Sequence, residues 1–182
     1  MQPVPRVTVI NIADALEAVA LRAALEWWNI EVSLRHIGAA DQLVALLDGT
    51  LALSPMVFLM CHGDERGILL PELAPELEAA QPFSGAIGPV ELRQFLHLPG
   101  CMVVNTGCST GTRELAAAFL DGGASVYIGP DDYPDADGSL FYCLSLAYGH
   151  LVRGYPLEEA HRRAAAYDAE TGQFQYFTHS AP

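Results

Sequence analysis

The chain is 182 residues long and carries 22 acidic residues against nine basic ones, which gives a net charge of −13. All nine basic residues are arginines, so phosphate loops and Schiff-base enzymes that depend on lysine are excluded. An acidic chain without lysine is also a poor match for nucleic acid or an anionic membrane. The length and a hydrophobic share of 51% predict one globular domain over residues 1–182.

The first part of the chain predicts strands that alternate with helices. Val7–Ile12 is short, apolar and β-branched, which is typical of a buried strand. The next segments predict a helix over Ala13–Trp28, a strand over Ile30–Ile37 and a helix over Ala40–Leu47. Pro55–Cys61 is the most hydrophobic run, and it predicts a central strand covered on both faces.

The same alternation continues after an irregular excursion or small hairpin over residues 71–88. The further predicted elements are a short extended piece at Ile68–Leu70, strands at Cys101–Asn105 and Ala124–Ile128, and helices at Pro89–Leu96, Gly111–Leu120, Ser139–Val152 and Leu157–Ala169. The tail Phe174–Phe177 is expected to dock on the sheet or on another subunit. This order predicts an α/β fold with a mainly parallel sheet, whose ligands bind beyond the carboxyl ends of its strands.

Two short segments with reactive side chains follow predicted strands. His62 and Gly63 come directly after Pro55–Cys61, and Cys108 lies in the loop after Cys101–Asn105. Adjacent parallel strands end at the same edge of a sheet, so we expect the two loops to meet in one crevice.

The residue types in these loops predict attack by Cys108 on a carbonyl carbon. The helix that follows, capped at Thr110 or Thr112, is expected to favour the Cys108 thiolate through its N-terminal N–H groups and dipole. The N–H groups of Gly63 and Cys108 would hold the oxyanion, and His62 would protonate the leaving amine. A histidine and a cysteine at strand ends are also common packing and turn residues, so residue type alone leaves both interpretations open.

The order of these segments resembles the caspase-like clan of cysteine peptidases. Residues 9–34 resemble the first βαβ unit of the clan and residues 57–69 its histidine block. Residues 103–129 resemble its cysteine block, most closely in the CHAT branch. The similarity covers about residues 6–168, and it implies a caspase-like three-layer αβα sandwich with a cysteine–histidine dyad.

The chain departs from the clan at the positions that select the substrate. The arginine-bearing loop after the first strand is missing, because Ile12 runs almost directly into helix. Thr106 stands where metacaspases carry an acidic residue, and Asp131 and Asp132 are the nearest acidic candidates in the chain. These three are the predicted substrate-binding residues, and the two aspartates predict a preference for a basic residue before the scissile bond. A solvated turn is the alternative interpretation of the aspartates.

The resemblance implies a bacterial-type cysteine peptidase that hydrolyses peptide bonds in a protein or peptide substrate. The alternative is a catalytically inactive caspase-like module that binds a protein partner through the same crevice, and a flavodoxin-like binder of a small ligand is a third interpretation. No cofactor and no metal site are expected, although the acidic loop 129–137 leaves a weak calcium site open.

Cellular context follows from the cysteines and the apolar runs. Cys61, Cys101 and Cys143 lie in apolar segments and are expected to be inert core thiols. Widely spaced cysteines and an N-terminus without a leader pattern predict a cytoplasmic protein. No apolar run reaches the roughly 20 residues that a membrane helix needs. Members of the clan often pair their sheets edge to edge, which implies a homodimer.

Overall fold

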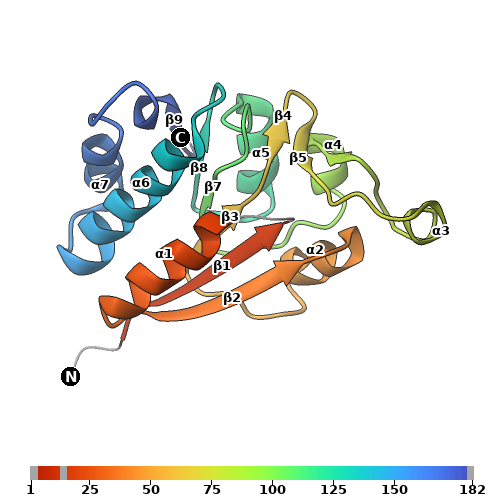
Figure 1. Cartoon of the computed structure of the whole chain (residues 1–182), viewed down its shortest axis with the longest axis horizontal. Helices are drawn as coiled ribbons and strands as arrows, with labels where there is room; N and C mark the ends of the chain where they lie inside the picture. Colours follow the sequence, from red (N-terminus) through yellow and green to blue (C-terminus); the bar gives the residue numbers. More distant parts are fainter. Residues whose placement is uncertain (1–3, 13–15, 180–182) are drawn as a thin grey trace.

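A six-stranded sheet in the order β2-β1-β3-β7-β8-β9 forms the centre of the molecule (Figure 1). The computed structural model describes residues 4–12 and 16–179. The strands are β1 (Arg6–Ile12), β2 (Glu31–Ile37), β3 (Met56–Met60), β7 (Met102–Asn105), β8 (Val126–Pro130) and β9 (Phe174–Thr178). All neighbouring pairs are parallel except β8 and β9, so the sheet is mainly parallel, as predicted.

Helices cover both faces of this sheet. Buried side chains of α1 (Leu16–Trp27), α6 (Ala136–Ala147) and α7 (Leu157–Ala164) form one core with the sheet. Those of α2 (Ala40–Leu47), α4 (Pro89–Leu92) and α5 (Arg113–Asp121) form the other. Because β3 is covered on both sides, every one of its residues is buried, which explains its uninterrupted apolar sequence.

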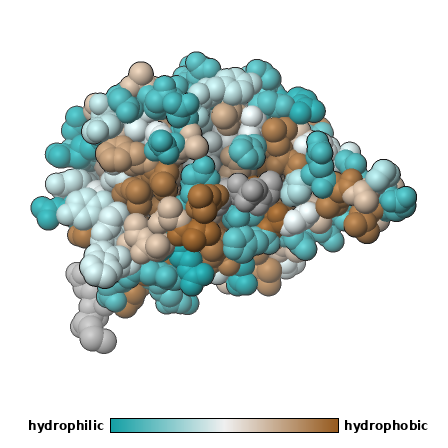
Figure 2. Space-filling model, viewed as in Figure 1, coloured by the Kyte–Doolittle hydropathy of each residue, from teal (hydrophilic) through white to brown (hydrophobic). Residues whose placement is uncertain are grey.

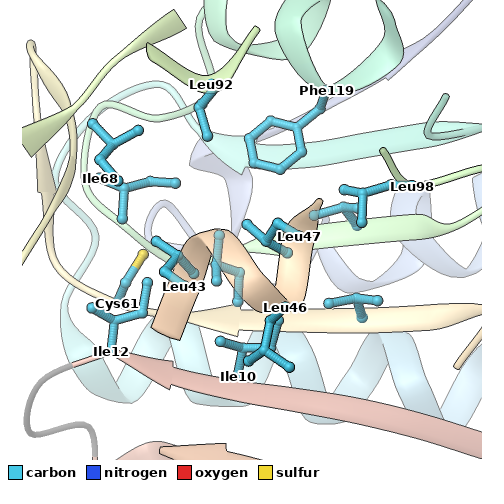
Figure 3. Packing of buried hydrophobic residues seen from close by; sticks show 14 of the residues in the cluster. Ile10, Ile12, Leu43, Leu46, Leu47, Cys61, Ile68, Leu92, Leu98 and Phe119 are labelled. Atoms are coloured by element: carbon cyan, nitrogen blue, oxygen red, sulfur yellow. The ribbon is translucent and has the colours of Figure 1, made fainter. Parts of the chain in front are cut away.

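The packing of α2 shows how apolar side chains at helical spacing contribute to the core. Leu43, Leu46 and Leu47 recur at helical spacing and are buried beside Ile10 and Ile12 of β1 (Figure 3). Each such leucine stabilises the fold by about 1.5–3 kcal/mol relative to an exposed position. The predicted bounds of this helix are confirmed without change.

A second, three-stranded sheet stands beside the carboxyl edge of the main one. It consists of β4 (Gly63–Asp64), β5 (Gly67–Leu69) and β6 (Ala86–Ile87), all antiparallel. Gly67 has a φ of 130° at the turn, a conformation that an L-residue with a side chain rarely adopts. The irregular segment predicted at 71–88 contains the short helix α3 (Pro75–Glu78) and the strand β6.

Several element ends differ from the sequence prediction. The helix expected at Ser139–Val152 begins earlier, at Ala136, and its last turns form the π-helix η1 (Tyr148–Val152). The tail forms β9, an edge strand paired with β8 that follows the short 3₁₀-helix η2 (Thr171–Gln173). Residues 13–15, included in the first predicted helix, lie outside the described residues.

The face that carries α1 and α6 exposes apolar side chains. Leu16 and Val19 of α1 and Phe141 of α6 are exposed, and Figure 2 shows apolar residues gathered where these two helices lie. Within the part of the chain that the structure describes, no helix is both long and apolar enough to cross a bilayer.

Candidate active site

Two loops meet at the carboxyl edge of the sheet because β3 and β7 are neighbours in register. Leu59 pairs with Asn105, and the Thr106 N–H donates to the Leu59 carbonyl over 3.0 Å. His62 follows β3 and Cys108 follows β7, so the two side chains leave adjacent strands at the same edge. The predicted adjacency of these two strands is confirmed.

His62 and Cys108 line one cavity of about 160 Å³. His62 is exposed and Cys108 is half-buried, so a ligand in the cavity can reach both side chains. The other lining residues are Glu17, Met60, Cys61, Thr106, Pro134, Ala136 and Ser139. They come from the ends of β3 and β7 and from the first turns or preceding loops of α1 and α6.

The reactive groups have no competing partners among the described residues. No hydrogen bond from another residue of 4–12 or 16–179 reaches the Cys108 sulfur or the His62 ring. Both side chains are therefore available to a bound ligand.

The expected effect of the following helix on Cys108 is wrong in direction. α5 begins at Arg113, and its cap is Thr112, whose hydroxyl oxygen accepts from the Leu115 N–H over 3.2 Å. Cys108 lies four residues before this cap in the chain, outside the first turn of the helix, where the dipole acts most strongly. Burial raises the pKa of the Cys108 thiol, and the nearby Asp132 carboxylate acts in the same direction. The raised pKa favours the protonated thiol at neutral pH.

We expect the alkylation of Cys108 by iodoacetamide to accelerate continuously as the pH rises from 7 to 9. Only the thiolate reacts, and a raised pKa keeps the thiolate fraction small, so the rate should rise by about tenfold per pH unit. The measurement is the mass-spectrometric labelling rate at Cys108 as a function of pH. A rate that is already constant at pH 7 would mean a lowered pKa and would contradict this description.

The loop that carries Cys108 is fixed by hydrogen bonds to the end of β8. Ser109 has a φ of 54°, unusual for a residue with a side chain, and its N–H donates to the Asp132 carbonyl over 2.9 Å. The Gly111 N–H donates to the Pro130 carbonyl over 2.6 Å, and a Cβ at Gly111 would lie 2.3 Å from the Gly129 oxygen. Glycine is needed at Gly111 because the loop and β8 are in direct backbone contact.

A buried polar network supports this loop from below. The Asn105 amide donates to the Tyr127 hydroxyl over 3.1 Å, and that hydroxyl donates to the Thr110 carbonyl over 2.9 Å. The Asn105 side-chain oxygen accepts from the Gly107 N–H over 2.8 Å and from the Cys61 thiol over 3.1 Å. Asn105 and Tyr127 were not among the predicted site residues, because in the sequence they appear only as members of apolar strands.

We expect Tyr127→Phe to lower the free energy of unfolding by about 1–3 kcal/mol. The variant leaves the ring stack on Phe119 in place but removes the partner of the Thr110 carbonyl and of the Asn105 amide. Urea unfolding of wild type and variant measures the difference. An unchanged unfolding free energy would mean that the network does not hold the loop.

The backbone of Gly63 lies beside Cys108. Gly63 pairs with Ile68 in the β4–β5 ladder, and one residue earlier the Leu69 N–H donates to the His62 carbonyl over 3.0 Å. Hydrogen-bonded and non-hydrogen-bonded pairs alternate in an antiparallel ladder, so the N–H of Gly63 points away from β5. A Cβ at Gly63 would lie 2.5 Å from the Cys108 oxygen, so this backbone touches the loop itself.

The predicted substrate-binding residues occupy different places. Thr106 lines the cavity, and its hydroxyl accepts from the Cys61 N–H over 3.2 Å and donates to the Leu59 carbonyl. Asp131 and Asp132 are exposed and do not line the cavity, although Asp132 is near enough to affect the pKa of Cys108. Glu17 and Ser139, which do line it, were missed, because only the packing of α1 and α6 brings them there.

The loop after β8 is hydrogen-bonded to the segment that follows His62. The Tyr133 hydroxyl donates to the Glu65 carboxylate over 2.6 Å, and this bond lowers the pKa of Glu65. Within residues 4–12 and 16–179, no group of three or more histidine, cysteine or carboxylate side chains comes together as a metal site. The Tyr133–Glu65 hydrogen bond links the acidic loop to the segment after His62.

The sequence matches no model of a protein family and no curated protein. Solved structures do resemble the fold. One is the Saccharomyces cerevisiae separase–securin complex, with a TM-score of 0.62, 10% identity, and coverage of 96% of this chain and 12% of that one.

A second similar structure is the complex of Porphyromonas gingivalis RgpB pro- and mature domains, with a TM-score of 0.62 and 12% identity. It is matched over 95% of this chain and 47% of that one, so this chain spans less than half the length of either neighbour. A third similar structure is that of the Arg-specific cysteine proteinase gingipain R (RgpB), with a TM-score of 0.62 and 10% identity. With its helices on both faces of a mainly parallel six-stranded sheet, the chain has the caspase-like fold.

Proposed function

We propose that the chain is a cysteine peptidase, similar to the CHAT branch, that hydrolyses peptide bonds in a protein substrate with Cys108 as nucleophile and His62 as acid and base. The observation that carries this proposal is the cavity that Cys108 and His62 line together at the carboxyl edge of the sheet. The caspase-like fold supports it, because both solved neighbours have this fold and gingipain R is named a cysteine proteinase.

In the first half of the reaction, His62 takes the proton from the Cys108 thiol as the sulfur attacks the substrate carbonyl carbon. A carbon–sulfur bond forms, and the carbonyl electron pair moves to oxygen. The N–H groups of Gly63 and Cys108 donate to this oxyanion. The carbon–nitrogen bond then breaks, and His62 returns its proton to the leaving amine.

In the second half, a water molecule attacks the Cys108 thioester. His62 accepts a proton from the water, the oxyanion forms again, and the carbon–sulfur bond breaks. The sulfur leaves with the proton from His62, which restores the thiol and releases a carboxylic acid. The raised pKa of the Cys108 thiol makes a base necessary in the first half and favours the protonated sulfur at the end.

Substrate binding in this proposal involves Thr106 in the cavity and the exposed carboxylates of Asp131 and Asp132 outside it. The carboxylates add negative potential beside Cys108, which favours basic segments of a substrate. The reaction uses no cofactor. A cytoplasmic location fits, because the mechanism requires a free thiol. Edge-to-edge pairing of the sheets of two copies remains our prediction.

Labelling with a peptidyl chloromethyl ketone tests the proposal, with and without calcium. We expect one adduct per chain, on Cys108, formed faster than with iodoacetamide because the peptide part binds in the cavity. Faster labelling of Cys108 in the presence of calcium would mean that calcium activates the peptidase. Reaction at Cys108 no faster than with iodoacetamide would instead support an inactive module that binds a partner.

A further inference from the structure

The sheet face under α2 changes from apolar to polar along β1 and β2. Ile10, Ile12 and Ile37 lie on this face, in the core that α2 covers. Successive side chains of a strand point to opposite faces, and β1 and β2 are paired in register. The same face therefore carries polar side chains nearer the amino ends of the two strands: Arg6, Thr8, Glu31, Ser33 and Arg35.

The helix α2 is too short to cover this polar part of the face. Its eight residues span about 12 Å, whereas the seven residues of β1 span about 23 Å. Figure 1 shows α2 beside the carboxyl ends of β1 and β2, away from their amino ends. Another segment of the chain is therefore needed to form a wall there.

A cavity of about 310 Å³, here called the amino-edge cavity, lies over the polar part of the face. Its opposite wall is the segment 52–55, which leads into β3. The Ser54 N–H donates to the Thr8 hydroxyl oxygen over 3.0 Å, and Thr8 is only 2% exposed, so the wall is fixed to the sheet. The volume lies at the lower end of the roughly 300–1,000 Å³ of pockets that hold small ligands.

The amino-edge cavity is lined by hydrogen-bond donors that have no partner. The Arg35 guanidinium makes no ion pair or hydrogen bond with another described residue, and neither do the hydroxyls of Ser33 and Ser54. Arg6 donates to Glu31 through Nη2 over 2.8 Å, which leaves its other nitrogens without a partner in the described part of the chain. Two arginines and one glutamate line the cavity, so its charge is positive although the chain carries −13.

Donors around a positive charge are suited to an oxyanion, and arginine is the side chain that binds phosphate and carboxylate oxygens in pairs. In the amino-edge cavity the donors come from two sides, Arg35 and Ser33 on the sheet and Ser54 on the opposite wall. Donors on two sides suit the tetrahedral oxygens of a phosphate better than a planar carboxylate. The segment 52–55 also offers apolar surface to an organic group beside the phosphate: Ala52, Leu53 and Pro55.

We propose that the amino-edge cavity binds the phosphate group of a small phosphomonoester, with Arg35 as its main ligand. Ser33 and Ser54 donate to the phosphate from opposite sides, and Arg6, held in place by Glu31, adds a second guanidinium. The amino-edge cavity shares no lining residue with the cavity of His62 and Cys108. The proposal therefore holds independently of the peptidase function.

Thermal unfolding of the full chain with added ligands provides the test. At about ten times its Kd, glycerol 3-phosphate should raise the Tm of wild type by about 3–6 °C. Inorganic phosphate should bind less tightly, because it leaves the apolar wall uncovered. Glycerol should have no effect at the same concentration, and succinate at equal ionic strength should bind at least about tenfold more weakly. Isothermal titration calorimetry supplies the Kd values.

Arg35→Gln should weaken the binding of glycerol 3-phosphate by about 10- to 100-fold, and Ser33→Ala by about 3- to 10-fold. Arg35 is exposed and has no partner among the described residues, so the variant should keep the wild-type Tm without ligand. The matched control is Arg113→Gln, which removes the same charge from an exposed position of α5 outside the amino-edge cavity. This control should keep the wild-type Kd.

Four results would overturn the proposal. They are the absence of a Tm shift with glycerol 3-phosphate, an equal affinity for succinate, an unchanged Kd in Arg35→Gln, and an equal loss in Arg113→Gln, which would indicate a general charge effect. The alkylation of Cys108 by iodoacetamide should proceed at the same rate with and without glycerol 3-phosphate. Protection of Cys108 would place the ligand in the cavity of His62 and Cys108 and would also contradict the proposal.

Discussion

Replacing Cys108 by alanine is expected to abolish peptide hydrolysis, with a loss of at least about 1,000-fold. The substitution removes the only half-buried thiol of the chain, because the other three cysteines are buried. Labelling by a thiol electrophile at neutral pH should disappear together with activity. Cys108 makes no side-chain hydrogen bond with another described residue, so the fold should remain, and circular dichroism with thermal unfolding checks this.

Cys101→Ala is the matched control for this substitution. Cys101 precedes β7 and Cys108 follows it, so the two thiols lie at opposite ends of one strand. The control should keep full activity and labelling while losing a little stability, since Cys101 is buried. Hydrolysis that persists in Cys108→Ala and is lost in Cys101→Ala would place the reaction at the amino end of β7 and would contradict the assignment of Cys108 as nucleophile.

Gly63→Ala is expected to lower kcat by at least about 100-fold, comparable to the loss of one oxyanion donor. The added Cβ would lie 2.5 Å from the Cys108 oxygen and 2.9 Å from the Gly107 carbon. Both contacts are with backbone, so the loop that carries the nucleophile must move. The shift separates the N–H groups of Gly63 and Cys108 from the position where the oxyanion forms. Steady-state kinetics should show a fall in kcat that exceeds any rise in KM.

Gly38→Ala supplies the comparison for Gly63→Ala. Its added Cβ would meet only the Gln42 side chain, at 3.8 Å, and Gly38, which follows β2, does not line the cavity. Activity should be unchanged in this variant. Equal activity in Gly63→Ala and wild type would show that the close contact at Gly63 does not shape the site.

Much of the fold could be predicted from the sequence because its signals are local. β3 is apolar at every position, as a strand covered on both faces must be, and the leucines of α2 repeat at helical spacing. β9 was not predicted as a strand, because Phe174–Thr178 becomes one only by pairing with β8, more than 40 residues earlier in the chain. The helix predicted to begin at Ser139 begins one turn earlier, at Ala136.

The site could be predicted only where strand order determines it. His62 and Cys108 follow neighbouring strands, and topology alone brings them to one edge. Glu17 and Ser139 reach the cavity through the packing of α1 and α6 on the sheet, which no spacing in the sequence reveals. The pKa of Cys108 was expected to fall, but burial of the thiol raises it, and the extent of burial depends on packing that the sequence does not show.

The central claim is that Cys108 and His62 form a peptidase site. The most direct measurement is mass spectrometry of a diverse peptide library after incubation with the purified wild-type protein. We expect internal cleavage, with new carboxyl termini that contain one oxygen from ¹⁸O-labelled water, and no cleavage with Cys108→Ala or His62→Ala. A folded wild-type protein that is alkylated at Cys108 yet leaves every peptide intact would contradict the claim.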